Sequence, residues 1–283
     1  MVDSGFGLPA VAAGDMDILT SVCGASLFNI IAKGAPVRFF MDRGRETPGM
    51  GSQAILASPA MHAAGFSSAA GYRHLKGKTI ATSVRGKVAH YLHLRGLRAA
   101  GLDADDVEWQ WGMESDVAVK LMNSGKIDAT LMPLPGAYAA ERNGVARIAT
   151  WSDEIEPHMQ LACFAANEKS LRERSSAFVR FAMAMMQGNR EFMAAAKTGD
   201  PVVLKILADG TRLPAALIDQ TRPRWTDMAL DGLPNIANVM AQQRFWQENT
   251  DFLPKTVDED RLFDLRVVAE ARRRLGENNP FAA

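Results

Sequence analysis

Two short segments place hydroxyl, thiol and cationic side chains directly before a predicted helix. Residues 20–24 contain Ser21, Cys23 and Gly24, and residues 82–87 contain a second set, namely Thr82, Ser83, Arg85, Gly86 and Lys87. The first N–H groups of a helix have no partner inside it, so they stabilise a carboxylate, sulfonate or phosphate. Both segments are therefore predicted to contact a small anion. Helix capping by Ser21 and solvation of Arg85 and Lys87 are the structural alternatives.

A third segment and one aromatic residue are predicted to line the same ligand site. Pro133, Leu134 and Pro135 follow the apolar run 127–132, and Trp111 ends the run 107–111. Open α/β sheets bind ligands beyond the carboxyl ends of their strands, where such residues form a rigid apolar wall. A helix entry for the prolines and a core position for Trp111 remain the alternatives.

The remaining reactive residues do not predict catalysis or a metal. His90 and His93 are one helical turn apart, but no carboxylate or cysteine at ligand spacing accompanies them. Asp17 and Asp128 each follow a glycine closely, which favours turn hydrogen bonding. Nucleophile-elbow, P-loop and zinc-protease motifs are absent from the sequence, and no cofactor is expected.

One thiol and one arginine pair leave alternatives open. Cys23 precedes a predicted helix, a position that lowers a thiol pKa and keeps a nucleophilic role open. Buried free thiols are the simpler interpretation of Cys23 and Cys163. Arg43 and Arg45, in a glycine-rich loop, are expected to be solvated, although a bidentate anion clamp is the alternative.

A repeated pattern predicts the elements that position these residues. A glycine, a short apolar strand, a helix, a second glycine and a second strand begin at Gly14 and recur from Gly125. Such a repeat predicts two similar α/β lobes. The second copy is preceded by a strand at 78–82, a helix at 88–100, a strand at 107–111 and a helix at 115–124. The first copy lacks these predecessors, so its lobe is expected to be N-terminally incomplete.

The predicted architecture is a two-lobed α/β fold with a helical C-terminal tail. Residues 1–74 and 165–283 are assigned to lobe one with the tail, and residues 75–164 to lobe two. The tail is expected to cover lobe one and to end in a single helix over 257–275. A ligand cleft is expected between the lobes.

Bulk composition excludes several classes of protein. Among 283 residues, 32 Lys and Arg balance 32 Asp and Glu, so no net charge favours nucleic acid. No apolar run approaches the ~20 residues of a membrane span, and no signal peptide is recognised. Two cysteines are too few for a disulfide framework.

Four short sequence motifs resemble those of nitrate-, sulfonate- and taurine-type solute-binding proteins of ABC importers. They also resemble those of the related proteins that bind or make the thiamine pyrimidine. They are AAGDMDI at 12–18, LKGKTIA at 75–81, LRAAGLDADDV at 97–107 and SGKIDA at 124–129. The resemblance covers about residues 8–270 and implies a type II periplasmic-binding-protein-like fold. It also implies a small-molecule solute, an ABC permease partner and a periplasmic or extracytoplasmic location. The family begins with one strand and helix more.

Alternatives to a solute-binding protein remain. An enzyme on the same scaffold, of desulfinase or aromatic-acid decarboxylase type, is the second hypothesis, and Cys23 is the residue that supports it. A non-functional or regulatory fragment is the third. Because unpaired strand edges invite pairing, an incomplete lobe one also predicts homodimerisation or low stability.

Overall fold

The computed structural model describes residues 4–277, and these group into two units. Unit one comprises the chain up to Arg45, Met159–Thr198 and the chain from Asp227 onward. Unit two comprises Glu46–His158 and Gly199–Thr226. The short strands β3 (Arg45–Glu46) and β9 (Met159–Gln160) lie where the chain passes from one unit to the other.

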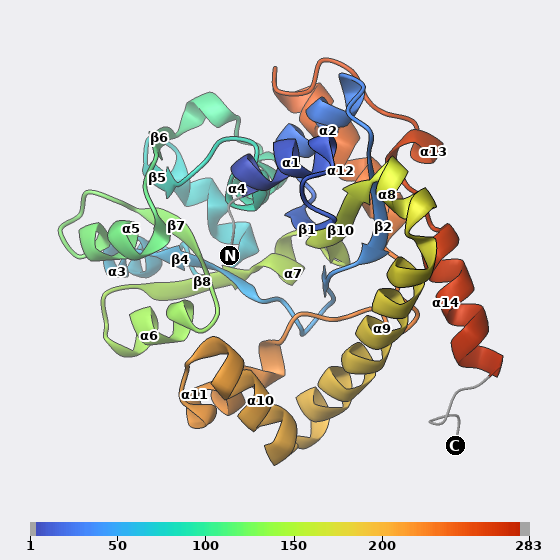
Figure 1. Cartoon of the computed structure of the whole chain (residues 1–283). Coiled ribbons are helices and arrows are strands. Elements are labelled where there is room, and N and C mark those ends of the chain that lie inside the picture. The colour runs from blue at the N-terminus through green and yellow to red at the C-terminus, as the bar shows by residue number, and fades with distance from the viewer. Residues whose placement is uncertain (1–3, 278–283) are drawn as a thin grey trace. The chain divides into compact units, whose positions relative to one another are not determined.

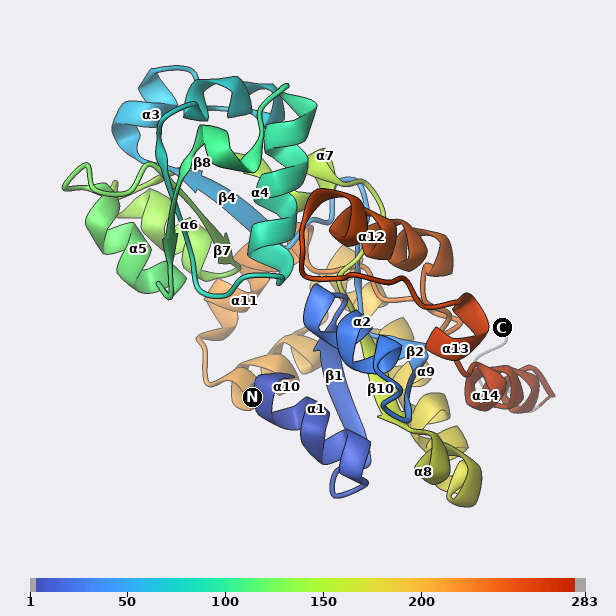
Figure 2. The same ribbon diagram turned by 90° about the horizontal axis from the view of Figure 1, so that it is seen from above.

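Unit one contains a three-stranded antiparallel sheet in the order β1-β10-β2 (Figure 1). Its strands are β1 (Ile18–Val22), β10 (Ala162–Asn167) and β2 (Val37–Asp42). The central β10 is antiparallel to both neighbours, with Ser21 opposite Cys163. Helix α2 (Ala25–Ala32) connects β1 to β2, and Figure 2 shows α1 (Ser4–Ala13) alongside β1.

Five further helices belong to unit one. They are α8 (Glu168–Glu173), α9 (Ser175–Thr198), α12 (Ile236–Asn249), α13 (Glu259–Leu262) and α14 (Arg266–Glu277). Three of them, α8, α9 and α14, contribute to its main core with the sheet. Phe40 of β2 lies at the centre of this core, with its ring edge-on to Phe178 of α9 at 5.4 Å. Val268 of α14 is fully buried in the same cluster. Burial of each such side chain stabilises the unit by about 1.5–3 kcal/mol.

The prediction of one helix over 257–275 is wrong. The chain forms α13, then an extended stretch, then α14. Phe263 makes a parallel bridge with Phe39, and the Asp264 N–H donates to the Phe39 carbonyl at 2.8 Å. The edge of β2 thus offers these residues hydrogen bonds that compete with helix formation.

Unit two contains a five-stranded mixed sheet in the order β6-β5-β7-β4-β8. The strands are β6 (Glu108–Trp111), β5 (Thr79–Thr82), β7 (Ala129–Pro133), β4 (Gln53–Ala57) and β8 (Arg147–Trp151). The predicted strands near 78–82, 107–111 and 127–132 are confirmed, and β5 is parallel to both β6 and β7. Strand β4 is antiparallel to its neighbours.

Short and medium helices surround this sheet within unit two. They are α3 (Pro59–Ala63), η1 (Ala69–Leu75), α4 (Val88–Ala99), η2 (Ala104–Asp106), α5 (Ser115–Met122), α6 (Gly136–Arg142), α7 (Ser152–Ile155), α10 (Pro201–Thr211), α11 (Ala215–Thr221) and η3 (Arg222–Arg224). Helices α4 and α5 correspond to the predicted helices at 88–100 and 115–124.

The repeat predicted from the sequence is present as two strand-helix-strand segments. Its two copies are β1-α2-β2 and β7-α6-β8. In each copy the two strands lie on either side of an antiparallel third strand, which is β10 in unit one and β4 in unit two. The copies are therefore built alike around a strand that comes from elsewhere in the chain.

The unit boundaries differ from the expected ones. Residues 46–74 group with unit two because β4 pairs with β7 and β8. Residues 199–226 also group with unit two, where the Arg224 guanidinium pairs with Asp153 at 2.9 Å. The expectation that the tail covers lobe one stays a prediction for this segment.

Candidate anion-binding site

Three of the predicted residues, Thr82, Ser83 and Trp111, lie together at the carboxyl ends of strands β5 and β6 in unit two. Thr82 and Trp111 are the last residues of β5 and β6 and lie opposite each other in the ladder. The Gly112 N–H donates to the Ser83 carbonyl at 3.2 Å, which joins the two loops that follow. The carboxyl ends of parallel strands are where α/β sheets bind ligands.

Arg85 lies on the face of Trp111. Its guanidinium carbon is 4.5 Å from the ring centre, and the Trp111 ring stacks in turn on Trp109 at 5.0 Å. The Arg85 side chain is exposed, and within residues 4–277 it makes no ion pair. The stack restrains the guanidinium while its N–H donors stay available for an oxyanion.

His90 holds this loop in place through a hydrogen bond to its backbone. Gly86 has φ of 77°, a conformation that favours glycine, and its N–H donates to His90 Nδ1 at 3.1 Å. Burial, and then the charge of Arg85, lowers the His90 pKa to about 4. The ring is therefore neutral at physiological pH, so its Nδ1 lone pair can accept this bond.

The neighbouring His93 is a core residue and forms no metal site with His90. Its ring is fully buried, its pKa is lowered to about 3 by burial, and its Nδ1 lies 3.1 Å from the Tyr72 hydroxyl. No cluster of three or more metal-ligating side chains occurs among the described residues.

The Thr82 hydroxyl is buried, and Oγ1 has no hydrogen-bond partner among the described residues. A buried hydroxyl without a partner costs about 1–3 kcal/mol. The position is the last of β5, directly before the anion-receptive loop. A ligand oxygen at this edge would supply the missing partner.

The third segment follows the neighbouring strand at the same edge. Pro133 ends β7 and is exposed, while Leu134 and Pro135 are half-buried before α6. The Leu134 N–H donates to the Ser52 carbonyl at 3.0 Å, and the Leu134–Pro135 peptide is cis. Lys87 is half-buried at the N-cap of α4.

In unit one, the segment of Ser21, Cys23 and Gly24 is more enclosed. Ser21 is 2% exposed and its hydroxyl donates to the Val22 carbonyl at 3.3 Å, so it does not cap α2. Gly24 is the N-cap residue. A ligand contact here, and the expected cleft joining the two groups of residues, stay predictions.

Cys23 has no general base as a side-chain partner among the described residues. It is buried, and its Sγ lies 4.0 Å from Cys163 Sγ. Burial, followed by the hydrogen bond with Cys23, raises the pKa of the Cys163 thiol well above its ordinary value. A protonated thiol cannot activate a neighbouring nucleophile, because the base must accept a proton.

Sequence reasoning missed a buried carboxylate network in unit two. Glu46 is fully buried and accepts hydrogen bonds from the Ser52 N–H at 2.6 Å, the Ser52 hydroxyl at 2.9 Å and the Ser152 hydroxyl. Burial raises the Glu46 pKa, the serine bonds oppose that rise, and the charge of Asp153 adds to it. Since the Ser52 carbonyl accepts from Leu134, the network supports the third segment.

The partner of Arg45 was also unforeseen. Its guanidinium pairs with Asp227 at 3.3 Å within unit one, so it is neither simply solvated nor free to clamp an anion. Arg43 contacts the thioether of Met228. No short sequence motif marks either contact, because the partners are more than 180 residues away.

The comparisons with known proteins agree with the predicted resemblance. Residues 65–197 match the family model described as NMT1/THI5 like. The periplasmic aliphatic sulphonate binding protein SsuA from Escherichia coli is 22% identical, with a TM-score of 0.68 over 92% of this chain and 79% of that one. The periplasmic nitrate-binding protein NrtA from Synechocystis PCC 6803 is 11% identical, with a TM-score of 0.74 over 97% and 79%.

A third similar structure is a mutant of DSZB in complex with biphenyl-2-sulfinic acid. It is 17% identical, with a TM-score of 0.60 over 94% of this chain and 88% of that one. A search of curated proteins finds no match. The periplasmic-binding-protein-like fold is thus confirmed. In the part of the chain that the structure describes, none of the helices could cross a membrane.

Proposed function

We propose that this chain is a solute-binding protein for ABC-type import. It binds a small organic or oxyanionic ligand at the carboxyl ends of the parallel strands β5, β6 and β7 in unit two. The observation that carries the proposal is Arg85, an unpaired guanidinium stacked on Trp111 at the start of α4. The ligand class is an anion such as a sulfonate or carboxylate. Its charge would meet Arg85 and the first N–H groups of α4, and its body would meet the wall of Pro133, Leu134 and Pro135.

The similar structures support a role in transport. Two of them are periplasmic binding proteins for aliphatic sulphonate and for nitrate, both oxyanions. By this likeness the chain would work outside the cytoplasm and deliver its ligand to a permease. No comparison supports the homodimer that the sequence analysis considered, and it is not part of the proposal.

Binding without turnover is favoured over the enzyme alternative. The likeness to DSZB keeps an enzyme on this scaffold under consideration. An enzyme of that kind would need an activated nucleophile, and among the described residues the side-chain partner of Cys23 is the buried thiol of Cys163. Ser21, Cys23 and Gly24 are retained as predicted ligand contacts rather than catalytic groups.

Calorimetric titration with a panel of anions tests the proposal. The panel would contain taurine, ethanesulfonate, nitrate and benzoate. The substitution Arg85→Met is expected to weaken binding of the preferred anion by about 10- to 100-fold, because a charge-assisted hydrogen bond is lost. Arg98→Met is the matched control, since Arg98 is an arginine of α4, which follows the Arg85 loop, and it pairs with Asp103.

The same samples separate binding from catalysis. Mass spectrometry of an aryl sulfinate and an aromatic acid after incubation is expected to show no product from the wild type or from Cys23→Ala. Product that disappears with Cys23→Ala would establish the enzyme alternative. Equal affinity of Arg85→Met and wild type for every anion would contradict the proposed site.

A further inference from the structure

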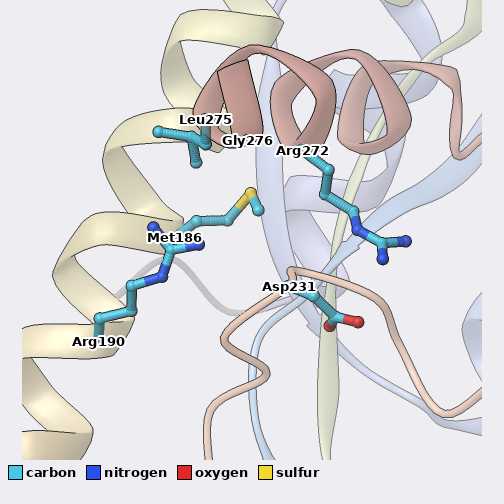
Figure 3. A pocket seen from close by; sticks show the side chains of 6 residues that line it. All are labelled: Met186, Arg190, Asp231, Arg272, Leu275 and Gly276. Carbon is cyan, nitrogen blue, oxygen red and sulfur yellow. The ribbon is translucent and has the colours of Figure 1, made fainter. Parts of the chain in front are cut away.

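We propose a second, independent binding site in unit one, which takes a small organic monoanion such as a short-chain carboxylate or sulfonate. The site is a cavity of about 150 Å³ (Figure 3). Helices α9 and α14 line it, together with Asp231 from the loop between η3 and α12. Its lining residues are Met186, Arg190, Asp231, Arg272, Leu275 and Gly276.

Arg190 supplies the first reason for a ligand. It is half-buried on α9, and its Nη1 is enclosed without any hydrogen-bond acceptor among the described residues. Buried donors are almost always paired, and an enclosed cationic donor without an acceptor is more costly than a neutral one. Arg190 also lines the cavity, where an oxyanion would supply the opposite charge for its guanidinium.

Arg272 supplies the second reason. It belongs to a run of three arginines on α14, and Arg273 and Arg274 both donate to the Glu270 carboxylate. Within residues 4–277 no carboxylate is paired with Arg272, and its side chain is exposed at the cavity. Arg273 and Arg274 thus share one carboxylate, whereas Arg272 lines the cavity without one among the described residues.

The cavity also limits the charge and shape of the ligand. Asp231 lies in the lining, and its Oδ1 accepts the Leu233 N–H at 3.0 Å. Two guanidinium groups and one carboxylate leave a single net positive charge. A monoanion would neutralise it, whereas a dianion would leave one desolvated negative charge uncompensated. Met186 and Leu275 give the cavity an apolar surface for one or two methylene groups.

Propionate is the probe, and the Arg85→Met background silences the site proposed above. In a low-chloride Bis-Tris buffer, which carries no sulfonate or carboxylate, propionate is expected to raise the melting temperature of this background protein. The gain should disappear with Arg190→Met or Arg272→Met, with affinity about 10-fold weaker or worse. It should persist with Arg273→Met, which removes a neighbouring arginine outside the cavity lining.

A local chemical readout needs no second substitution. Phenylglyoxal modifies accessible guanidinium groups, and peptide mass spectrometry locates the modified residue. Propionate should protect Arg190 and Arg272 but not Arg212, and inorganic phosphate should protect them less. Equal modification with and without propionate, or an equal melting gain in all three variants, would overturn the proposal. Absence of any melting gain in the Arg85→Met background would also overturn it, because propionate would then act through the site in unit two.

Discussion

The two units share a module and differ in what is added to it. In both, a strand-helix-strand segment flanks an antiparallel third strand, giving β1-β10-β2 and β7-β4-β8. In unit two, β7 also pairs with β5, which pairs with β6. In unit one, β1 pairs only with β10 within the residues described, and α1 lies beside it.

This difference places the candidate chemistry. Thr82, Arg85 and Trp111 all belong to, or directly follow, the strands that only unit two adds. The corresponding turn of unit one holds Ser21 and Cys23, which are buried and include no cationic side chain. The shared module therefore positions a loop, and the added parallel strands supply the charge and the aromatic surface.

The largest expected effect is on the free energy of unfolding, and it tests how far the unit one sheet depends on its aromatic core. Phe40→Ala removes a fully buried ring that contacts Phe178 and Phe164. The substitution is expected to lower the free energy of unfolding by about 3–5 kcal/mol. Hydrogen exchange should show faster opening of β2 and β10. Unchanged protection of both strands would contradict this account of the core.

Acid should act mainly on unit two. The folded pKa of His90 is about 4, below the ordinary value of 6.5, because burial disfavours the charged ring. The unfolded chain therefore binds the proton first as pH falls, so stability declines from about pH 6.5 to about pH 4 and then levels off. The loss is about 3 kcal/mol for this group.

The variant His90→Gln checks the assignment, because a glutamine oxygen can accept from Gly86 without titrating. Denaturant unfolding across this pH range should show a shallower decline for the variant. An identical decline in both proteins would mean that other groups cause the acid sensitivity.

A smaller effect would test the unpartnered hydroxyl at the end of β5. Thr82→Val is expected to stabilise the chain by about 1 kcal/mol and to weaken binding of the preferred anion. Thr130→Val is the matched control on β7, since the Thr130 hydroxyl donates to the Ala81 carbonyl at 3.0 Å. The control should lose about 1 kcal/mol and bind normally. If Thr82→Val were the less stable variant, its hydroxyl would have a partner.

The sequence predicted the repeated module and most of its strands, because local signals mark them. Glycines at Gly125 and Gly144, both with positive φ, bound short apolar runs that read plainly as strands and helices. The segments at 82–87 and 133–135 were located by the same signals. The antiparallel strands β10 and β4 were not placed between their neighbours, because pairing over more than 70 residues leaves no local pattern.

The features that the sequence did not predict depend mostly on contacts between residues far apart in the chain. The Glu46 network joins residues 46, 52 and 152, and the break between α13 and α14 depends on the edge of β2. The support that His90 gives to Gly86 has a faint local signal, since the two are four residues apart. The pairing of Arg224 with Asp153 has no local signal at all.

The central claim is that the strands added in unit two bind the solute, and hydrogen exchange with and without the preferred anion tests it most directly. The account predicts slower exchange of backbone amides at residues 83–90 and 112–115 when the anion is bound. It also predicts that Arg85→Met abolishes this protection at an equal anion concentration. Anion-dependent protection that is absent from residues 83–90 would contradict the claim.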